Sequence, residues 1–288
     1  MGKFSKDKRD IYYRKAKELG YRARSAFKLL QIDEEFNIFE NVTKVVDLCA
    51  APGSWSQVLS RKIYHNEEGV HDDVKIVAVD LQEMAPIEGV IQLQGDITSK
   101  DTSDTIISLF EGTKADLVIC DGAPDVTGLH DMDQYIQGQL LLSALGITTR
   151  VLKEGGRFIA KIFRGRDVTF LYGQLSVFFS KVICSKPKSS RNSSMEAFVV
   201  CEGFKLPEDY DPNTFSLSLT GVYDVNQLEN PINKQIVPFL ACGDLSGFDS
   251  DMSYPLEEKE GYIFHEPVQM PIHPPYLEYL NRKKDGKI

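Results

Sequence analysis

The sequence has no long hydrophobic run. None of its 288 residues falls in a stretch approaching the roughly 18 uncharged apolar residues that a membrane-spanning helix needs. The first nine residues, Met1 to Arg9, lack the apolar core of a secretory signal peptide. No mitochondrial targeting sequence is evident either. We therefore expect a cytoplasmic protein that does not associate with membranes.

The sequence also lacks the spacings that typify disulfide frameworks and metal sites. Its five cysteines show no C-x-x-C pattern, and its five histidines form no cluster. Three of the cysteines end or border apolar runs, which is typical of buried free thiols in a reducing compartment. We expect neither disulfides nor a metal ion. The cysteines are Cys49, Cys120, Cys184, Cys201 and Cys242.

Two common phosphate-binding motifs, G-x-x-x-x-G-K-[ST] and G-x-G-x-x-G, are absent from the most informative stretch, residues 45–55. That stretch begins as an apolar run typical of a buried parallel strand. Pro52 and Gly53 end the strand, and Ser54 is a candidate N-cap for a helix over 55–63. A strand, a glycine turn and a helix N-terminus favour a small charged ligand, although a tight turn without a ligand is the alternative.

Charge is distributed unevenly within a net charge of −9. Residues 1–30 hold ten basic and three acidic side chains, whereas residues 202–288 hold fifteen acidic and seven basic ones. The basic section predicts a phosphate-binding surface, because so lopsided a balance is unusual for an ordinary solvated helix. The acidic total therefore does not exclude nucleic acid as a partner.

Strand-like and helix-like segments alternate through the middle of the chain, which predicts a mostly parallel sheet with helices on both faces. The last two strands are joined by too short a connection for a parallel crossover, so the last strand should be antiparallel. His65 to Asp73 is expected to be a polar surface loop. We predict seven strands at 44–49, 75–80, 90–94, 115–121, 157–163, 181–184 and 196–201, and helices within 10–36 (with a break at Gly20) and at 55–63, 101–110, 134–152 and 168–179.

Composition suggests three sections. Residues 1–36 form a basic helical section for RNA binding, and residues 37–204 form the α/β core. Residues 205–288 are acidic and contain nine of the thirteen prolines. Part of this extension, Pro231 to Leu256, is too apolar for a solvated linker, so we expect an extended segment packed on the core, on a partner, or on both.

Three aspartates, Asp80, Asp96 and Asp121, fall at or just after the ends of predicted strands. Ligands of open α/β sheets bind at that edge. Asp80 is placed to bridge ribose hydroxyls, and Asp96 is placed to accept from an adenine amino group. Aspartate is also common at strand ends for purely structural reasons, but three in a row beside the glycine turn favour a nucleoside ligand.

Lys161 is unusual because it lies inside an apolar strand. A structural lysine normally keeps its tip in water. Burial would lower the pKa of Lys161, which could then act as a base or orient a hydroxyl group. Glu196 begins the last strand after a polar loop that could hold phosphate or ribose, while Lys28 by itself would pass for a solvated helix residue.

Four separated motifs occur in order along the chain, at residues 21–29, 47–57, 120–128 and 186–196. Together they closely resemble the FtsJ-like ribose 2′-O-methyltransferases. The resemblance covers roughly residues 1–204 and implies a Rossmann-like fold with S-adenosylmethionine as methyl donor. It implies a catalytic set of Lys28, Asp121, Lys161 and Glu196, and cofactor contacts from Gly53, Trp55, Asp80, Asp96 and Asp121.

The extension, through residues 236–246 and 253–256, resembles the eukaryotic cytosolic tRNA members of that family. That resemblance implies methylation of the tRNA anticodon loop at positions 32 and 34, with separate helpers: a WD-repeat protein and a large helical-repeat protein. We expect the extension to dock a helper. The alternatives are an rRNA 2′-O-methyltransferase, a non-catalytic RNA-binding scaffold that keeps the fold, and a small-molecule methyltransferase, which the basic N-terminal section disfavours.

Overall fold

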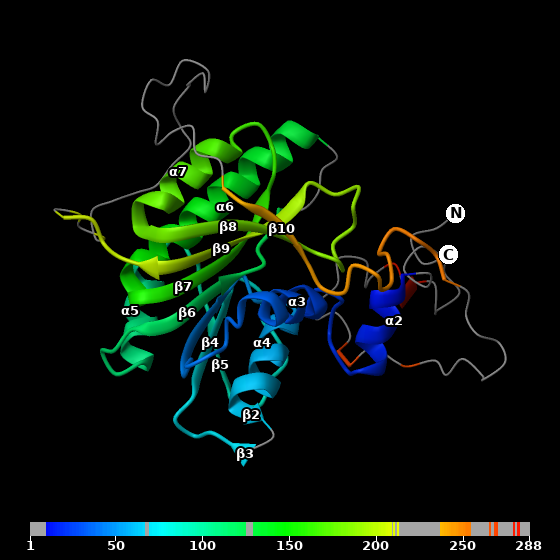
Figure 1. The fold of residues 1–288 in the computed structure, drawn as a ribbon. Coiled ribbons are helices and arrows are strands. Elements are labelled where there is room, and N and C mark those ends of the chain that lie inside the picture. Colours follow the sequence, from blue (N-terminus) through cyan, green and yellow to red (C-terminus); the bar gives the residue numbers. More distant parts are fainter. Residues whose placement is uncertain are drawn as a thin grey trace.

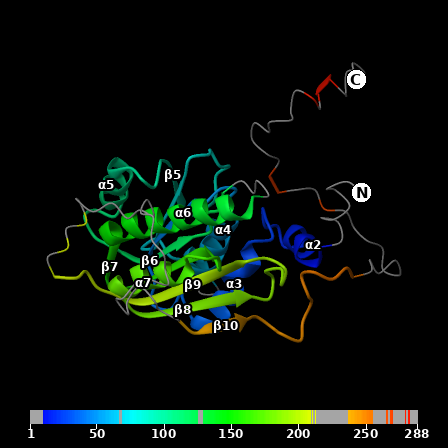
Figure 2. The same ribbon diagram turned by 90° about the horizontal axis from the view of Figure 1, so that it is seen from above.

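The computed structural model describes residues 10–66, 69–124, 129–208 and 237–254, together with residues 210, 212, 265, 268–269, 279 and 281–282. Within these residues the chain forms a central sheet with helices on both faces (Figures 1 and 2). Met1 to Arg9, the end of the third motif at 125–128, and most of the extension lie outside the described residues.

The central sheet has eight strands in the order β10-β8-β9-β7-β6-β1-β4-β5. All seven predicted strands are present, and β9 is antiparallel to both β7 and β8 as expected. The mostly parallel α/β fold is therefore confirmed. The strands are β1 (Lys44–Leu48), β4 (Lys75–Asp80), β5 (Val90–Gln94), β6 (Ala115–Cys120), β7 (Leu152–Phe163), β8 (Phe179–Pro187), β9 (Glu196–Phe204) and β10 (Phe239–Cys242).

Helices cover the sheet in two groups, each with its own hydrophobic cluster. One cluster packs α5, α6 and α7 against alternate strand residues such as Val46 and Phe158. The other packs α3 and α4 against the intervening residues, such as Val45 and Ile159. This period of two is what a sheet buried on both faces requires. The helices are α2 (Ile11–Glu18), α3 (Ala26–Phe36), α4 (Ser54–Leu59), the π-helix η1 (Ser60–Tyr64), α5 (Lys100–Leu109), α6 (His130–Val151) and α7 (Val168–Phe178).

The turn between β1 and α4 requires glycine at position 53. Gly53 has a φ of +100°, and a Cβ there would lie 2.8 Å from both the Arg22 guanidinium and Ile87. Gly53, and not Ser54 as predicted, is the N-cap of α4. The glycine thus lets the chain turn sharply at the sheet edge where ligands of such folds bind.

The loop after η1 contains more structure than the sequence predicted. Two short strands, β2 (His65–Asn66) and β3 (Gly69–Val70), pair antiparallel as a small hairpin. The prediction of a plain polar loop at 65–73 was wrong in this respect, because two-residue strands leave no periodic signal.

Among the described residues, no helix has the length and apolar character needed to cross a membrane.

The eighth strand comes from the C-terminal extension. β10 pairs parallel with β8, and Cys242 at its end is 1% exposed. From β10 the chain runs on toward α2, as the orange segment in Figure 1 shows. Within residues 237–254 the predicted packing on the core is confirmed by this pairing and by the Tyr12 hydroxyl, which donates to the Phe248 carbonyl at 3.1 Å. Packing of the extension on a partner stays a prediction.

Candidate active site

A cavity of about 680 Å³ opens at the carboxyl ends of the parallel strands. Its wall contains all three strand-end carboxylates singled out in the sequence: Asp80, Asp96 and Asp121. The remaining lining residues are Arg22, Cys49, Ala51, Pro52, Leu81, Gln82, Glu83, Gly95, Ile97, Thr98, Gly122, Ala123, Leu140 and Gln269. The structure therefore brings together residues that lie more than forty positions apart in the chain.

Two of these carboxylates are fixed by local hydrogen bonds. Asp80 accepts from the Ala51 backbone N–H at 2.9 Å through Oδ2 and from the Gln82 N–H at 2.7 Å through Oδ1. Asp96 accepts from the Thr98 N–H at 2.8 Å and its hydroxyl at 2.7 Å, both through Oδ1. Each carboxylate keeps acceptor lone pairs that can receive hydroxyl or amino donors from a ligand.

Gly53 and Trp55, the other two residues predicted to contact a cofactor, are not among the residues that line the cavity. Trp55 is 2% exposed, and its indole N–H donates to the Ser25 carbonyl at 2.9 Å. Its ring packs against Phe198, with the ring centroids 5.6 Å apart. The side chain of Trp55 is therefore part of the core, and a cofactor contact from either residue stays a prediction.

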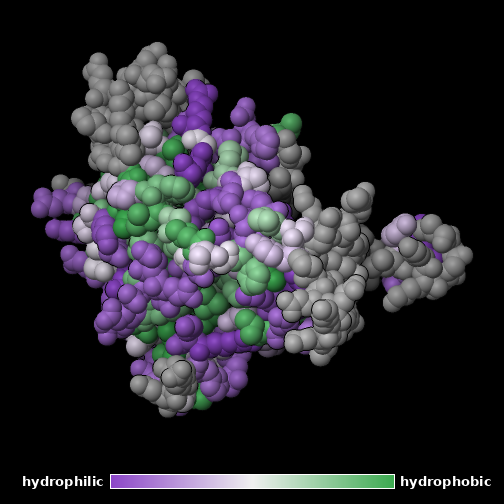
Figure 3. All heavy atoms as spheres, turned by 45° about the vertical axis from the view of Figure 1, so that its right-hand side comes forward, coloured by the Kyte–Doolittle hydropathy of each residue, from purple (hydrophilic) through white to green (hydrophobic). Residues whose placement is uncertain are grey.

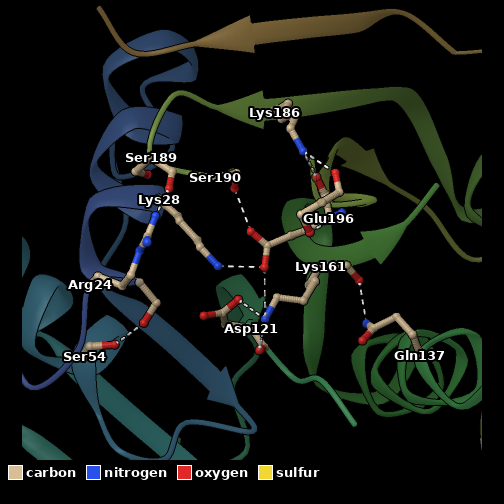
Figure 4. A network of polar contacts seen from close by, with 12 residues as sticks. Arg24, Lys28, Ser54, Asp121, Gln137, Lys161, Lys186, Ser189, Ser190 and Glu196 are labelled. Atoms are coloured by element: carbon tan, nitrogen blue, oxygen red, sulfur yellow. Dashed lines mark hydrogen bonds and ion pairs between the residues drawn. The ribbon is translucent and has the colours of Figure 1, made fainter. Parts of the chain in front are cut away.

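The four residues of the predicted catalytic set converge beside this cavity (Figure 4). The Lys161 ammonium lies 2.7 Å from Asp121 Oδ1, donates to the Asp121 carbonyl at 2.8 Å, and lies 3.7 Å from Glu196 Oε2. Lys28 donates to the same Glu196 oxygen at 2.7 Å. Glu196 thus bridges the two lysines, and two positive charges face two negative ones.

Strand periodicity explains why these residues meet. Lys161 lies opposite Phe198 in the β7–β9 pairing, and Glu196 lies two residues earlier in β9. Residues two apart in a strand share a face, so Lys161 and Glu196 lie on the face that α3 covers. Helix α3 contributes Lys28, whose Nζ lies 5.6 Å from the Phe198 ring centroid. Asp121 follows directly after β6, the neighbour of β7.

The pKa of Lys161 is raised, which corrects the expectation that burial would lower it. Burial does favour the neutral amine, but the charges of Asp121 and Glu196 outweigh it. Lys28, the second cation of the set, is paired with Glu196. Burial would raise the pKa of Glu196, yet Lys28 and Lys161 together hold it at about 2. The charged forms of Lys161 and Glu196 are therefore both favoured at neutral pH.

Three supporting residues were not singled out individually in the sequence, although Lys186 and Ser190 lie within the fourth motif. The Ser190 hydroxyl donates to Glu196 Oε1 at 2.6 Å, and Gln137 Nε2 donates to the Lys161 carbonyl at 3.1 Å. Lys186 donates to the Glu196 carbonyl at 2.8 Å (Figure 4). Polar residues in helices and loops are common, so the individual roles of these residues emerge from their contacts with the predicted catalytic set.

Asp47 is a fourth residue that the sequence analysis did not single out individually. Its side chain is fully buried in β1, and its Oδ2 accepts from the Ser56 hydroxyl at 2.6 Å. Burial raises its pKa to about 7, with the nearby charges of Asp121 and Asp80 adding to the shift. An acidic residue within an apolar strand was the available signal, of the same kind that drew attention to Lys161.

The chemistry of the cavity fits the nucleoside and sulfonium portions of S-adenosylmethionine. Volumes of roughly 300–1,000 Å³ are typical of sites for small ligands. Carboxylates suit a ligand that carries ribose hydroxyls and positive charge. Among the described residues, no cluster of histidine, cysteine, aspartate and glutamate has the arrangement of a metal site.

Comparison with known sequences shows a match to the FtsJ-like methyltransferase family over residues 21–204. A human protein named tRNA (cytidine(32)/guanosine(34)-2′-O)-methyltransferase is 60% identical over 292 residues, which span 100% of this chain and 87% of that protein. A protein of the same name from Schizosaccharomyces pombe is 55% identical and covers 98% of each chain.

Among solved structures, one from Plasmodium falciparum described as a ribosomal RNA methyltransferase superposes with a TM-score of 0.56 at 26% identity. It covers 64% of this chain and 98% of that chain. The structural likeness is thus confined to part of the chain, whereas the sequence likeness to the two tRNA methyltransferases runs through nearly all of it.

Proposed function

Since this chain belongs to the FtsJ-like methyltransferase family, we propose that it transfers a methyl group from S-adenosylmethionine to the ribose 2′-hydroxyl of tRNA nucleotides 32 and 34. The observation that carries the proposal is the meeting of Lys28, Asp121, Lys161 and Glu196 beside a cavity walled by Asp80 and Asp96. The substrate is inferred from relatives with that name that match the full length of the chain. Anticodon-loop nucleotides suit this chemistry because their riboses are accessible in single strands.

S-adenosylmethionine supplies a sulfonium methyl group as the electrophile. Asp80 would hold its ribose hydroxyls, and Asp96 would accept from its adenine amino group. Asp121 lies between this cavity and Lys161, because it both lines the wall and pairs with the ammonium. This residue thus links cofactor binding to the catalytic lysine.

Lys161 is placed to hold the ribose hydroxyl. Its Nζ donates to the Asp121 carbonyl and forms ion pairs with the carboxylates of Asp121 and Glu196 at 2.7 and 3.7 Å. Because Lys28 and Ser190 already hold Glu196, the ammonium keeps the capacity to donate to the 2′-oxygen. Because its pKa is raised, Lys161 rests as an ammonium. This favours orienting the hydroxyl over removing its proton before the methyl group is attacked, and orientation alone can supply much of the acceleration.

The direct test is transfer of labelled methyl groups from S-adenosylmethionine by the purified full-length chain, with its helper proteins present. We expect label on tRNA, mapped by mass spectrometry to the riboses of nucleotides 32 and 34. Ribosomal subunits and protein-free small molecules are the comparison substrates. Label on rRNA with none on tRNA would contradict the substrate, and no transfer to any RNA would favour the non-catalytic scaffold.

We further propose that the protein acts in the cytoplasm and that its two terminal sections bind different partners. The basic section, residues 1–36, would bind RNA phosphates, and the extension, residues 205–288, would dock a WD-repeat or helical-repeat helper. Exposed apolar side chains within the described extension support the docking role: Leu245 is 60% exposed and Met252 is 59% exposed. In Figure 3 hydrophobic and hydrophilic side chains are interspersed over the described surface of this side of the molecule.

Replacing Leu245 and Met252 by serine should weaken binding of a purified helper by about tenfold, because a few apolar contacts carry most of an interface's energy. Binding is measured by titration against the full-length chain. Val177→Ser, at a 40% exposed position on α7, is the matched control and should bind normally. Unchanged affinity of the double variant for both kinds of helper would argue against docking at this surface.

A further inference from the structure

The loop between β8 and β9, which we call the β8–β9 loop (residues 188–195), sets the position of the Glu196 carboxylate. Ser190 Oγ donates to Glu196 Oε1 at 2.6 Å, and the Ser194 hydroxyl accepts from the Glu196 N–H at 3.1 Å. Lys186 ties the two ends together through the carbonyls of Ser194 and Glu196, at 2.7 and 2.8 Å. A shift of this loop would therefore move Glu196 relative to both catalytic lysines.

Helices α2 and α3 hold one side of the β8–β9 loop. Gln31 Oε1 accepts from the Ser189 N–H at 2.9 Å, and Arg24 donates to the Ser189 carbonyl. Arg191 pairs with Asp10 at 3.3 Å. Asp10 is also the N-cap of α2, so this side of the loop is fixed to a helix terminus.

The C-terminal extension holds the other side of the loop. One carboxylate, that of Asp251, accepts from the Asn192 N–H at 2.6 Å, the Ser193 N–H at 3.3 Å and the Ser193 hydroxyl at 3.2 Å. Asp249 accepts from Asn192 Nδ2 at 3.2 Å. The Cys242 carbonyl at the end of β10 accepts from the Lys188 N–H at 2.7 Å. The match to the family ends at residue 204, so these contacts come from outside the family's common core.

We propose that Asp251 is a positioning residue for catalysis, which acts through the β8–β9 loop to hold Glu196 against Lys28 and Lys161. This inference rests on the proposed function, since it assigns a role within that methyl transfer. The extension would then complete the active site, in addition to any docking of a helper. Asn192 and Ser193 lie in a turn and belong to no strand, so their amides make no sheet hydrogen bonds. Hydrogen bonds to a carboxylate are roughly twice as strong as neutral ones, which suits Asp251 to hold this turn.

The test compares Asp251→Ala with Asp244→Ala in the full-length chain. Both variants remove one negative charge from the same segment. The hydrogen bonds given for the Asp244 carboxylate come from the N–H and hydroxyl of Ser246 in its own turn, and it meets the β8–β9 loop through the charge of Lys188. In single-turnover assays at saturating helper, we expect Asp251→Ala to lower the rate by about tenfold, as small displacements of reacting groups do. The KM values for tRNA and cofactor should stay within about twofold of the wild type. The rate of Asp251→Asn should lie between those of Asp251→Ala and the wild type, and the rate of Asp244→Ala should match the wild type.

A double-variant cycle with Ser190→Ala identifies the route. If Asp251 acts through Ser190 and Glu196, the double variant should be no slower than the slower single variant. Multiplying effects, or an unchanged rate for Asp251→Ala, would overturn the proposal. Tighter tRNA binding by Asp251→Ala would also overturn it, since Asp251 would then be occupying a place that an RNA phosphate takes.

Hydrogen exchange gives a readout that does not depend on methyl transfer. The amides of Asn192 and Ser193, and those of the loop as far as Glu196, should exchange at least about tenfold faster in Asp251→Ala, whereas β7 should be unaffected. Unchanged exchange would overturn the inference even if the wild type proved inactive on every tRNA. The methyl-transfer assay of the wild type thus tests the proposed function, and hydrogen exchange in Asp251→Ala tests the role of Asp251 separately.

Discussion

Lys161→Met should lower methyl transfer by about a thousandfold or more while leaving cofactor affinity within about twofold of the wild type. The rate should fall because methionine has no N–H to hold the ribose oxygen, whereas the Lys161 ammonium pairs with Asp121 at the cavity wall and can donate. Cofactor affinity should persist because Lys161 is not among the residues that line the cavity. Single-turnover transfer of labelled methyl groups and calorimetric titration of S-adenosylmethionine measure the two quantities.

This variant needs a control for stability, since it leaves Asp121 and Glu196 facing each other without their shared cation. An uncompensated buried charge costs about 3–5 kcal/mol. Lys161→Met/Glu196→Gln removes one of the two charges and should be more stable but equally inactive. Lys153→Met, at an exposed position of the same strand, should be fully active. A folded Lys161→Met protein that binds cofactor and keeps more than about a tenth of the wild-type rate would contradict the proposed role.

The fold could be predicted because its signals are local. Seven strands were visible as apolar runs separated by helix-like or polar segments, and the direction of β9 followed from the short connection before it. β10 escaped notice as a strand because only four residues, Phe239–Cys242, pair with a strand more than fifty positions earlier. Such pairing depends on tertiary packing and not on the pattern of the segment itself.

The meeting of the four predicted catalytic residues could be expected from the sequence, but their electrostatics could not. Lys161 stood out as a charge inside an apolar strand, and the resemblance supplied its three companions. The sign of its pKa shift depends on which charges are nearest. Asp121 and Glu196 lie within 4 Å of the ammonium, whereas Lys28 is paired with Glu196. The sequence does not give the distances between the Lys161 ammonium and these charges, so the expected lowering of the Lys161 pKa was wrong.

Trp55 shows a related limit. It follows the glycine turn directly, and the sequence could not say whether its ring faces a ligand or the core. In a helix one position changes the direction of a side chain by about 100°. The structure places the ring in the core beside Phe198, away from the residues that line the cavity. The role of this side chain can therefore be tested through stability.

Trp55→Ala should lower the free energy of unfolding by about 3–5 kcal/mol, the usual cost of removing a large aromatic side chain from a core. It is among the largest fully buried side chains of the described residues, and it also satisfies the Ser25 carbonyl. Chemical denaturation followed by circular dichroism measures the loss. Tyr135→Ala, at a 47% exposed position on α6, should change stability by no more than about 0.5 kcal/mol.

Trp55→Phe separates the core role of this residue from a cofactor contact. Phenylalanine keeps most of the ring packing but cannot donate to Ser25, so we expect a loss of about 1–2 kcal/mol with cofactor affinity unchanged. Because Trp55 is the single tryptophan of the chain, its fluorescence in the wild type reports directly on this position. Cofactor addition should leave that emission nearly unchanged, since the ring is enclosed by core residues. Strong quenching by cofactor, together with a tenfold weaker affinity in a fully stable Trp55→Phe protein, would instead place the indole against the ligand.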